Sequence, residues 1–191
     1  MALPDATTIT GKGTTLKAAL AFIDSRWGQA GVDRVLAATD EDTRKLLTGL
    51  FLPSSRYPVK HLVHLCETID RVYGRGDLEL CWDIGRFAGE FEIKLLHRVF
   101  LKVLSLQYWL KMAGVTWKMY YSTGLLVPRI GEFEGDVKLS EFNPISKAFC
   151  YRFGGWVWHI VELSNHKNIK LQHTACMLDG APACVWSGTW T

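Results

Sequence analysis

The chain has 191 residues, of which 48% are hydrophobic and 12% aromatic. This length and composition predict one globular domain, residues 1–191, with a well-buried core, and they argue against a disordered chain. Its 22 basic and 19 acidic residues are scattered singly and give a net charge of only +3. Without a basic stripe, we do not expect nucleic acid as a partner.

Residues 1–13 are expected to be a flexible N-terminus. They contain neither the basic stretch nor the apolar core of a secretory signal, so a cytoplasmic location is expected. The most apolar run, Leu95–Val127, is interrupted by basic side chains, which excludes a simple membrane span. An odd number of cysteines, five, argues against a disulfide framework.

Residues 14–122 are predicted to be mainly helical. Apolar side chains recur at helical spacing from Leu16 to Arg26, and Gly28 follows as a stop signal. The same spacing, with acidic or small residues at the starts and glycines at several ends, predicts the remaining helices of this half. These cover Val32–Ala38, Asp42–Leu50, Val59–Tyr73, a segment capped by Asp77, and Leu95–Ser122, the last broken near Ser105 or Gly114.

Residues 123–191 change to a strand-rich pattern. A hairpin is predicted from strands Leu125–Ile130 and Val137–Phe142, followed by a helix over Ser146–Leu163. Residues 168–175 form the next predicted strand, and another begins at Cys184 after the turn at Asp179 and Gly180. The order helices-β-β-α-β-β predicts an α+β fold in which helices cover one face of a four-stranded antiparallel sheet.

Three of the five cysteines lie in the last 42 residues. In the predicted hairpin, Cys176 and Cys184 should lie nearly opposite each other, and Cys150 comes from the preceding helix. Three thiols in this arrangement are suited to binding zinc. Apolar packing is the rival interpretation, because free cysteines are among the most buried residues.

From Asn143 onward, the chain resembles the 4-vinyl reductase-type ligand-binding domain. It resembles more closely a bacterial family whose members have such a C-terminal segment after a helical N-terminal half. The wider superfamily includes ligand domains of phenol-sensing activators, haem NO-binding sensors and small subunits of a vesicle-tethering complex. The resemblance implies a dimeric ligand-binding domain and a zinc site of Cys150, His173, Cys176 and Cys184. His173 stands where the phenol sensors have a glutamate. Because an odd separation puts His173 and Cys176 on opposite strand faces, both reach one metal only through a bulge or a strand end.

The absence of the sequence motif of the haem sensors disfavours haem as a cofactor. The haem sensors carry a Tyr-x-Ser-x-Arg motif, whereas Tyr120 and Ser122 are followed by Gly124 at the arginine position. Catalytic motifs are absent, and the acids of the predicted helix after Asp77 resemble a mixed polar face, so we do not expect an enzyme. These acids are Glu79, Asp83, Glu90 and Glu92.

Aromatic residues of two helices are candidates for an apolar pocket. Core packing is the alternative for each of them. We therefore predict a non-catalytic sensory domain for an apolar or aromatic small molecule, acting as a homodimer or through a protein partner. A scaffold subunit with a closed pocket is the alternative, and a haem-based gas sensor ranks below both. The candidate pocket residues are Tyr108, Trp109, Trp117, Tyr120, Phe149, Phe153 and Trp156.

Overall fold

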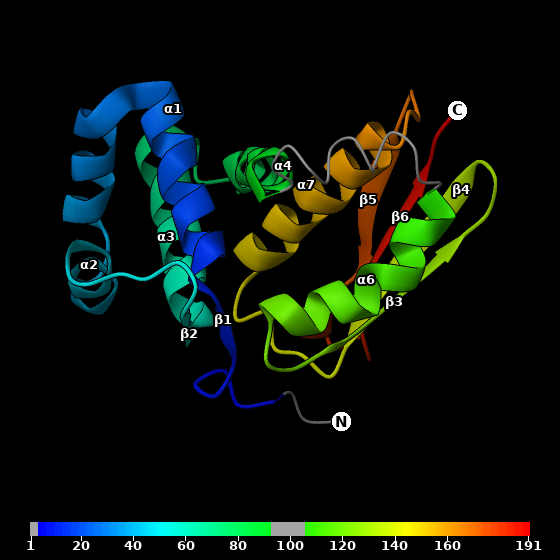
Figure 1. The fold of residues 1–191 in the computed structure, drawn as a ribbon, viewed down its shortest axis with the longest axis horizontal. Helices are drawn as coiled ribbons and strands as arrows, with labels where there is room; N and C mark the ends of the chain where they lie inside the picture. Colours follow the sequence, from blue (N-terminus) through cyan, green and yellow to red (C-terminus); the bar gives the residue numbers. More distant parts are fainter. Residues whose placement is uncertain (1–3, 93–105) are drawn as a thin grey trace.

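The computed structural model describes residues 4–92 and 106–191, and it confirms the predicted α+β fold. A helical N-terminal half lies beside a half built on an antiparallel sheet, and α6 and α7 cover one face of that sheet (Figure 1). No helix among the described residues combines the length and the hydropathy that crossing a membrane requires.

Helix α1 (Gly13–Ala38) includes both helices predicted on either side of Gly28. Gly28 has φ 65° and ψ −171°, values that lie outside the helical region. A left-handed φ is easily reached only by glycine, so the residue bends the helix instead of ending it.

Helices α2 (Glu41–Thr48) and α3 (Val59–Tyr73) follow, and α3 has the predicted bounds. Asp40 caps α2, because its carboxylate accepts a hydrogen bond of 2.9 Å from the backbone N–H of Thr43. Helix α3 packs against α1 and buries Leu62, Leu65 and Ile69, as its helical spacing predicts.

The N-terminus differs from its prediction. Strand β1 (Thr10–Lys12) pairs antiparallel with β2 (Arg56–Pro58), and Ile9 just before β1 is completely buried. The segment expected to be flexible is therefore partly ordered. Two strands of three residues each carry too little periodicity to be predicted, and their pairing depends on a partner more than 40 residues away.

Helices α4 (Glu79–Glu92) and α7 (Lys147–Leu163) cross in close contact. A Cβ atom on Gly85 would overlap the carbonyl of Arg152, and one on Gly155 would overlap the carbonyl of Trp82. Glycines on both helices thus allow the two backbones to touch. Along this contact Gly85 lies against Arg152, and Gly89 lies against His159.

Helix α6 (Leu106–Tyr120) is the described part of the long helix predicted from Leu95, and the residues before 106 lie outside the described part. The sheet follows in the order β3-β4-β6-β5, with every neighbouring pair antiparallel. Strand β4 begins three residues earlier than predicted. The strands are β3 (Leu125–Ile130), β4 (Glu134–Ser140), β5 (Lys170–Ala175) and β6 (Cys184–Thr189).

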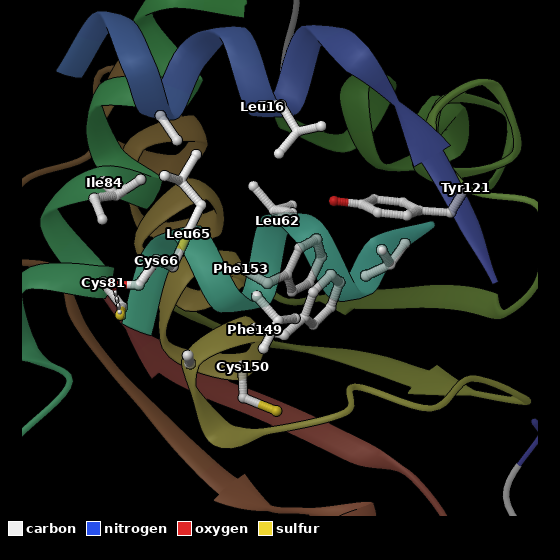
Figure 2. Close-up of a cluster of buried hydrophobic side chains, with 14 of the residues drawn as sticks. Leu16, Leu62, Leu65, Cys66, Cys81, Ile84, Tyr121, Phe149, Cys150 and Phe153 are labelled. Atoms are coloured by element: carbon white, nitrogen blue, oxygen red, sulfur yellow. Dashed lines mark hydrogen bonds between the residues drawn. The ribbon is translucent and has the colours of Figure 1, made fainter. Parts of the chain in front are cut away.

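One continuous cluster of buried side chains joins the two halves. Figure 2 shows Leu16 of α1 and Leu62 of α3 on one side, with Phe149 and Phe153 of α7 beside them. Cys66 and Cys81 are both buried in this cluster.

Candidate functional site

A small cavity lies between the helices and the sheet. Its volume is about 40 Å³, and its wall is made largely by aromatic rings. Helices α6 and α7 supply most of these rings, β3 contributes Leu126, and α1 contributes Thr15. Trp117 is fixed in the wall by a 2.7 Å hydrogen bond from its indole N–H to the carbonyl of Thr123.

Two oppositely charged side chains face this cavity. Glu92 is at the end of α4, and Arg152 is in the middle of α7. Their side chains are 6% and 4% exposed, and 3.5 Å separates Arg152 Nη2 from Glu92 Oε1. The close crossing of α4 and α7 is what places them together.

Burial changes the ionisation of the cavity's acidic groups. Loss of hydration raises the pKa of Glu92 to about 7, although Arg152 and hydrogen bonds oppose the change. Burial likewise raises the pKa of Tyr121 to about 12, so its hydroxyl is neutral at physiological pH. A carboxyl group that titrates near neutrality inside a cavity is typical of a functional site.

The structure brings together four of the seven predicted pocket residues. Trp117, Tyr120, Phe153 and Trp156 line the cavity, whereas Phe149 packs behind them, with its ring centroid 5.6 Å from that of Tyr121. The remaining two, Tyr108 and Trp109, lie in the first part of α6, where the structure describes the backbone alone.

Sequence reasoning did not select Glu92 and Arg152 as site residues. Glu92 was grouped with the polar face of its helix, and no site was predicted at Arg152. A usable signal was present, because Arg152 interrupts an apolar stripe one residue before Phe153 and four before Trp156. A charge at such a position must be either partnered or directed into a cavity.

The predicted cysteine set also converges. The ligand atoms of the four residues all lie within 4.8 Å of one another. The register of β5 shifts between His173 and Ala175, and this irregularity lets His173 and the residue after the strand, Cys176, approach the same point. The set consists of Cys150, His173, Cys176 and Cys184.

Hydrogen bonding within this cluster favours a thiolate at Cys184. Its Sγ lies 3.9 Å from Cys150 Sγ, and the backbone N–H of Met177 donates to it over 3.4 Å. The contact with Cys150 lowers the pKa of Cys184, and His173 adds to this effect. The same contact raises the pKa of Cys150. Figure 2 shows the sulfur of Cys150 pointing away from the rings of Phe149 and Phe153.

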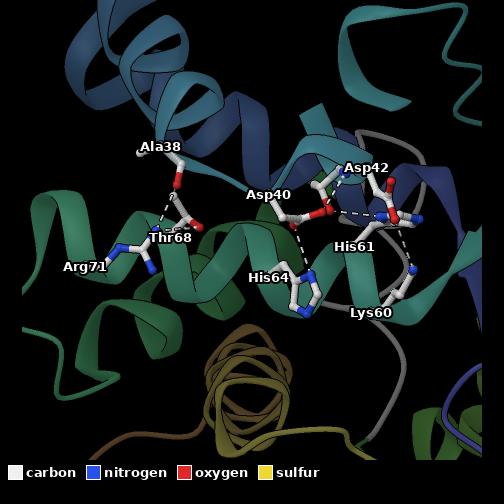
Figure 3. Close-up of polar contacts among 9 residues, drawn as sticks. Ala38, Asp40, Asp42, Lys60, His61, His64, Thr68 and Arg71 are labelled. Atoms are coloured by element: carbon white, nitrogen blue, oxygen red, sulfur yellow. Dashed lines mark hydrogen bonds and ion pairs between the residues drawn. The ribbon is translucent and has the colours of Figure 1, made fainter. Parts of the chain in front are cut away.

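The paired histidines of α3 have ordinary structural partners. His61 Nδ1 lies 2.9 Å from Thr43 Oγ1, and His64 Nδ1 lies 3.0 Å from Asp40 Oδ2, so both imidazoles contact the start of α2 (Figure 3). His159 is likewise held by Glu162, at 3.0 Å.

Solved structures show what this architecture is similar to. An H-NOX protein from S. oneidensis in the Fe(II)NO ligation state aligns with a TM-score of 0.71 and 12% identity, covering 94% of this chain and 99% of that one. The chain has the H-NOX fold. A mutant H-NOX domain from Shewanella oneidensis in the Fe(II)CO state gives a TM-score of 0.74 at 13% identity, covering 94% and 98%. The unliganded Fe(II) H-NOX protein from K. algicida gives 0.68 at 12%, covering 94% and 96%.

Sequence comparisons find no such relationship, since no family model and no curated protein matches the chain. At this identity the likeness concerns the fold. The predicted superfamily and the narrower assignment to the 4-vinyl reductase-type domain therefore both stay predictions.

The cofactor prediction was wrong. It ranked zinc first and disfavoured haem, but the solved structures with this H-NOX fold are described in Fe(II), Fe(II)NO and Fe(II)CO states. The prediction failed because it relied on one short motif around Tyr120, whereas the likeness extends over 94% of the chain.

The described residues by themselves do not form a haem site. Cavities for cofactor-sized ligands typically measure about 300–1,000 Å³, far above the 40 Å³ seen between α6 and α7. No histidine is found among the described residues that line this cavity, and His97 lies outside the described part. Flat aromatic walls and the Arg152 cation do suit a planar ligand that carries carboxylates.

Proposed function

We propose that this chain is a sensory domain that binds a small ligand in the cavity around Glu92 and Arg152 and performs no catalysis on it. The observation that supports this proposal most is the buried, oppositely charged pair facing an aromatic cavity. The volume of about 40 Å³ suits a molecule of a few atoms. The ligand is therefore smaller than most of the apolar or aromatic compounds that the sequence analysis predicts.

Among such ligands, diatomic gases are the first candidates. The structural neighbours are described with NO and CO, so the comparisons favour the haem-based gas sensor over the apolar-ligand and zinc interpretation. A bound haem would supply an iron atom to which these gases coordinate.

The proposal is tested with a variant that fills the cavity. Ala113→Trp places a large side chain in the lining of α6, while Val115→Trp makes the same change at a position that is 53% exposed. The protein is purified after growth with a haem precursor, and its visible absorption is recorded before and after addition of CO and NO. Its melting temperature is then measured across a panel of small molecules.

We expect a ligand-induced change, either in the haem absorption band or in the melting temperature, for the unmodified protein and Val115→Trp. Ala113→Trp should keep its circular dichroism spectrum and lose that change. The proposal is contradicted if all three proteins show no response to any ligand, or if Ala113→Trp responds as the unmodified protein does.

We further propose that the domain is cytoplasmic and passes its signal through a homodimer or a protein partner. Ligand binding is reported when it shifts the equilibrium of such a contact. The exposed face of α6 is one available surface, because Met112, Val115 and Met119 are 37–54% exposed there.

A further inference from the structure

The hydrogen-bonding capacity of Arg152 is incompletely used in the cavity. A guanidinium has five N–H donors. Its contact with Glu92 is 3.5 Å long, beyond the usual hydrogen-bond range, and it also contacts the hydroxyl of Tyr121. The Nε atom of Arg152 is buried and has no partner among the described residues. A buried donor without a partner costs free energy that a ligand can recover.

The positive charge of Arg152 is also incompletely balanced. Glu92 of α4 is the acidic side chain that lines the cavity with it, and burial holds the pKa of Glu92 near neutrality. The other titratable groups near Arg152 are Cys66 of α3 and, at the end of α6, Tyr120 and Tyr121. Burial raises the pKa of all three, so they stay neutral. The remaining described lining is mostly apolar. An anion entering this cavity would meet a cation in a poorly hydrated surrounding.

We infer that Arg152 makes this cavity a binding site for a small planar oxyanion, such as a simple carboxylate or nitrite. Two oxygens in one plane match the fork of guanidinium donors. The cavity volume of about 40 Å³ limits the ligand to a few heavy atoms. This inference rests on the proposed sensory function and adds small oxyanions to the gases as a second class of ligand for the same cavity.

Two variants with opposite expected effects test the inference. Both Glu92→Gln and Arg152→Gln remove the ion pair, so a purely structural role predicts a similar loss of stability for both. If the cavity binds an oxyanion, Glu92→Gln removes a competing negative charge and should bind formate at least about tenfold more tightly. Arg152→Gln should lose the response.

Binding is measured by titrating the unmodified protein and both variants with sodium formate and sodium nitrite, against sodium chloride at equal ionic strength. Trp117 and Trp156 line the cavity, so their fluorescence reports occupancy, and the melting temperature provides a second readout. In the unmodified protein, formate should bind more tightly at pH 6 than at pH 8, because protonation removes the charge of Glu92. This pH dependence should disappear in Glu92→Gln.

The inference is overturned if formate and nitrite act no differently from chloride on both the unmodified protein and Glu92→Gln. If haem or a gas still binds in that case, the proposed sensory function stands, and only the oxyanion inference is rejected. A further outcome is that Arg152→Gln loses haem binding while formate has no effect on any of the proteins. The guanidinium would then bind a carboxylate of a larger cofactor, and the inference would also be overturned.

Discussion

Glu92 shows how strongly the fold changes the chemistry of a single residue. Its carboxyl group would titrate near 4.5 in the unfolded chain, whereas burial raises its pKa to about 7 in the folded protein. Between these values the folded state binds more protons than the unfolded state. The free energy of unfolding should therefore fall as the pH rises from about 4.5 to about 7, and level off above that.

The first prediction concerns this pH dependence. A shift of this size corresponds to roughly 3 kcal/mol between the two ends of the window. Glu92→Gln should remove that decline, which is measured by urea unfolding between pH 4.5 and 8. Glu79→Gln, at the exposed start of the same helix, makes the same chemical change as a control. Equal pH profiles for the unmodified protein and Glu92→Gln would show that Glu92 is not the group responsible.

At the scale of elements, the crossing of α4 and α7 determines the position of the site. Gly85 and Gly155 remove the side chains that would hold the backbones apart. Arg152 and Glu92 are close to each other only because these two helices touch.

A second prediction follows from this contact. Gly155→Ala should destabilise the protein by about 2 kcal/mol or more, because the added methyl group overlaps the carbonyl of Trp82. Gly114→Ala is the matched control, since its Cβ would lie 3.4 Å from the nearest atom, the carbonyl oxygen of Leu126. In the interior of α6, that change should add roughly 0.5–1 kcal/mol of stability. Thermal and urea unfolding measure both, and similar effects of the two changes would contradict the argument.

Element positions followed well from local sequence signals where burial is periodic. The bounds of α3 agree with the prediction because its apolar side chains recur at helical spacing, and the bounds of β3 also agree. Gly28 was correctly identified as an interruption, but whether it ends or bends the helix depends on how the second half of α1 packs. Strand β1 was missed because its partner, β2, lies far along the chain.

At the scale of the whole molecule, the cysteine cluster joins the C-terminal hairpin to α7. Cys176 and Cys184 flank the turn of the hairpin, and Cys150 comes from the helix that packs on the sheet. We propose that these three thiols and His173 bind a metal ion, whose identity is left to experiment. Such a site would stabilise the tertiary arrangement, since the unfolded chain does not hold these groups together.

Removal of the metal is the measurement that checks this proposal. Dialysis against a strong chelator should lower the melting temperature, and elemental analysis should find the metal lost from Cys176→Ser. Cys81→Ser serves as a control, because Cys81 is a buried thiol outside the cluster. The cluster contributes only packing if protein purified without chelator contains no bound metal and both substitutions destabilise it equally.

The sequence by itself determined the α+β class, most element positions and the residues that meet in the cysteine cluster. These depend on apolar periodicity, on turn residues and on the likeness of a short segment, all of which are local. The tertiary structure decided where the cavity lies, how small it is and which charges face it. Glu92 and Arg152 are 60 residues apart, and their burial depends on a helix crossing that no local pattern predicts.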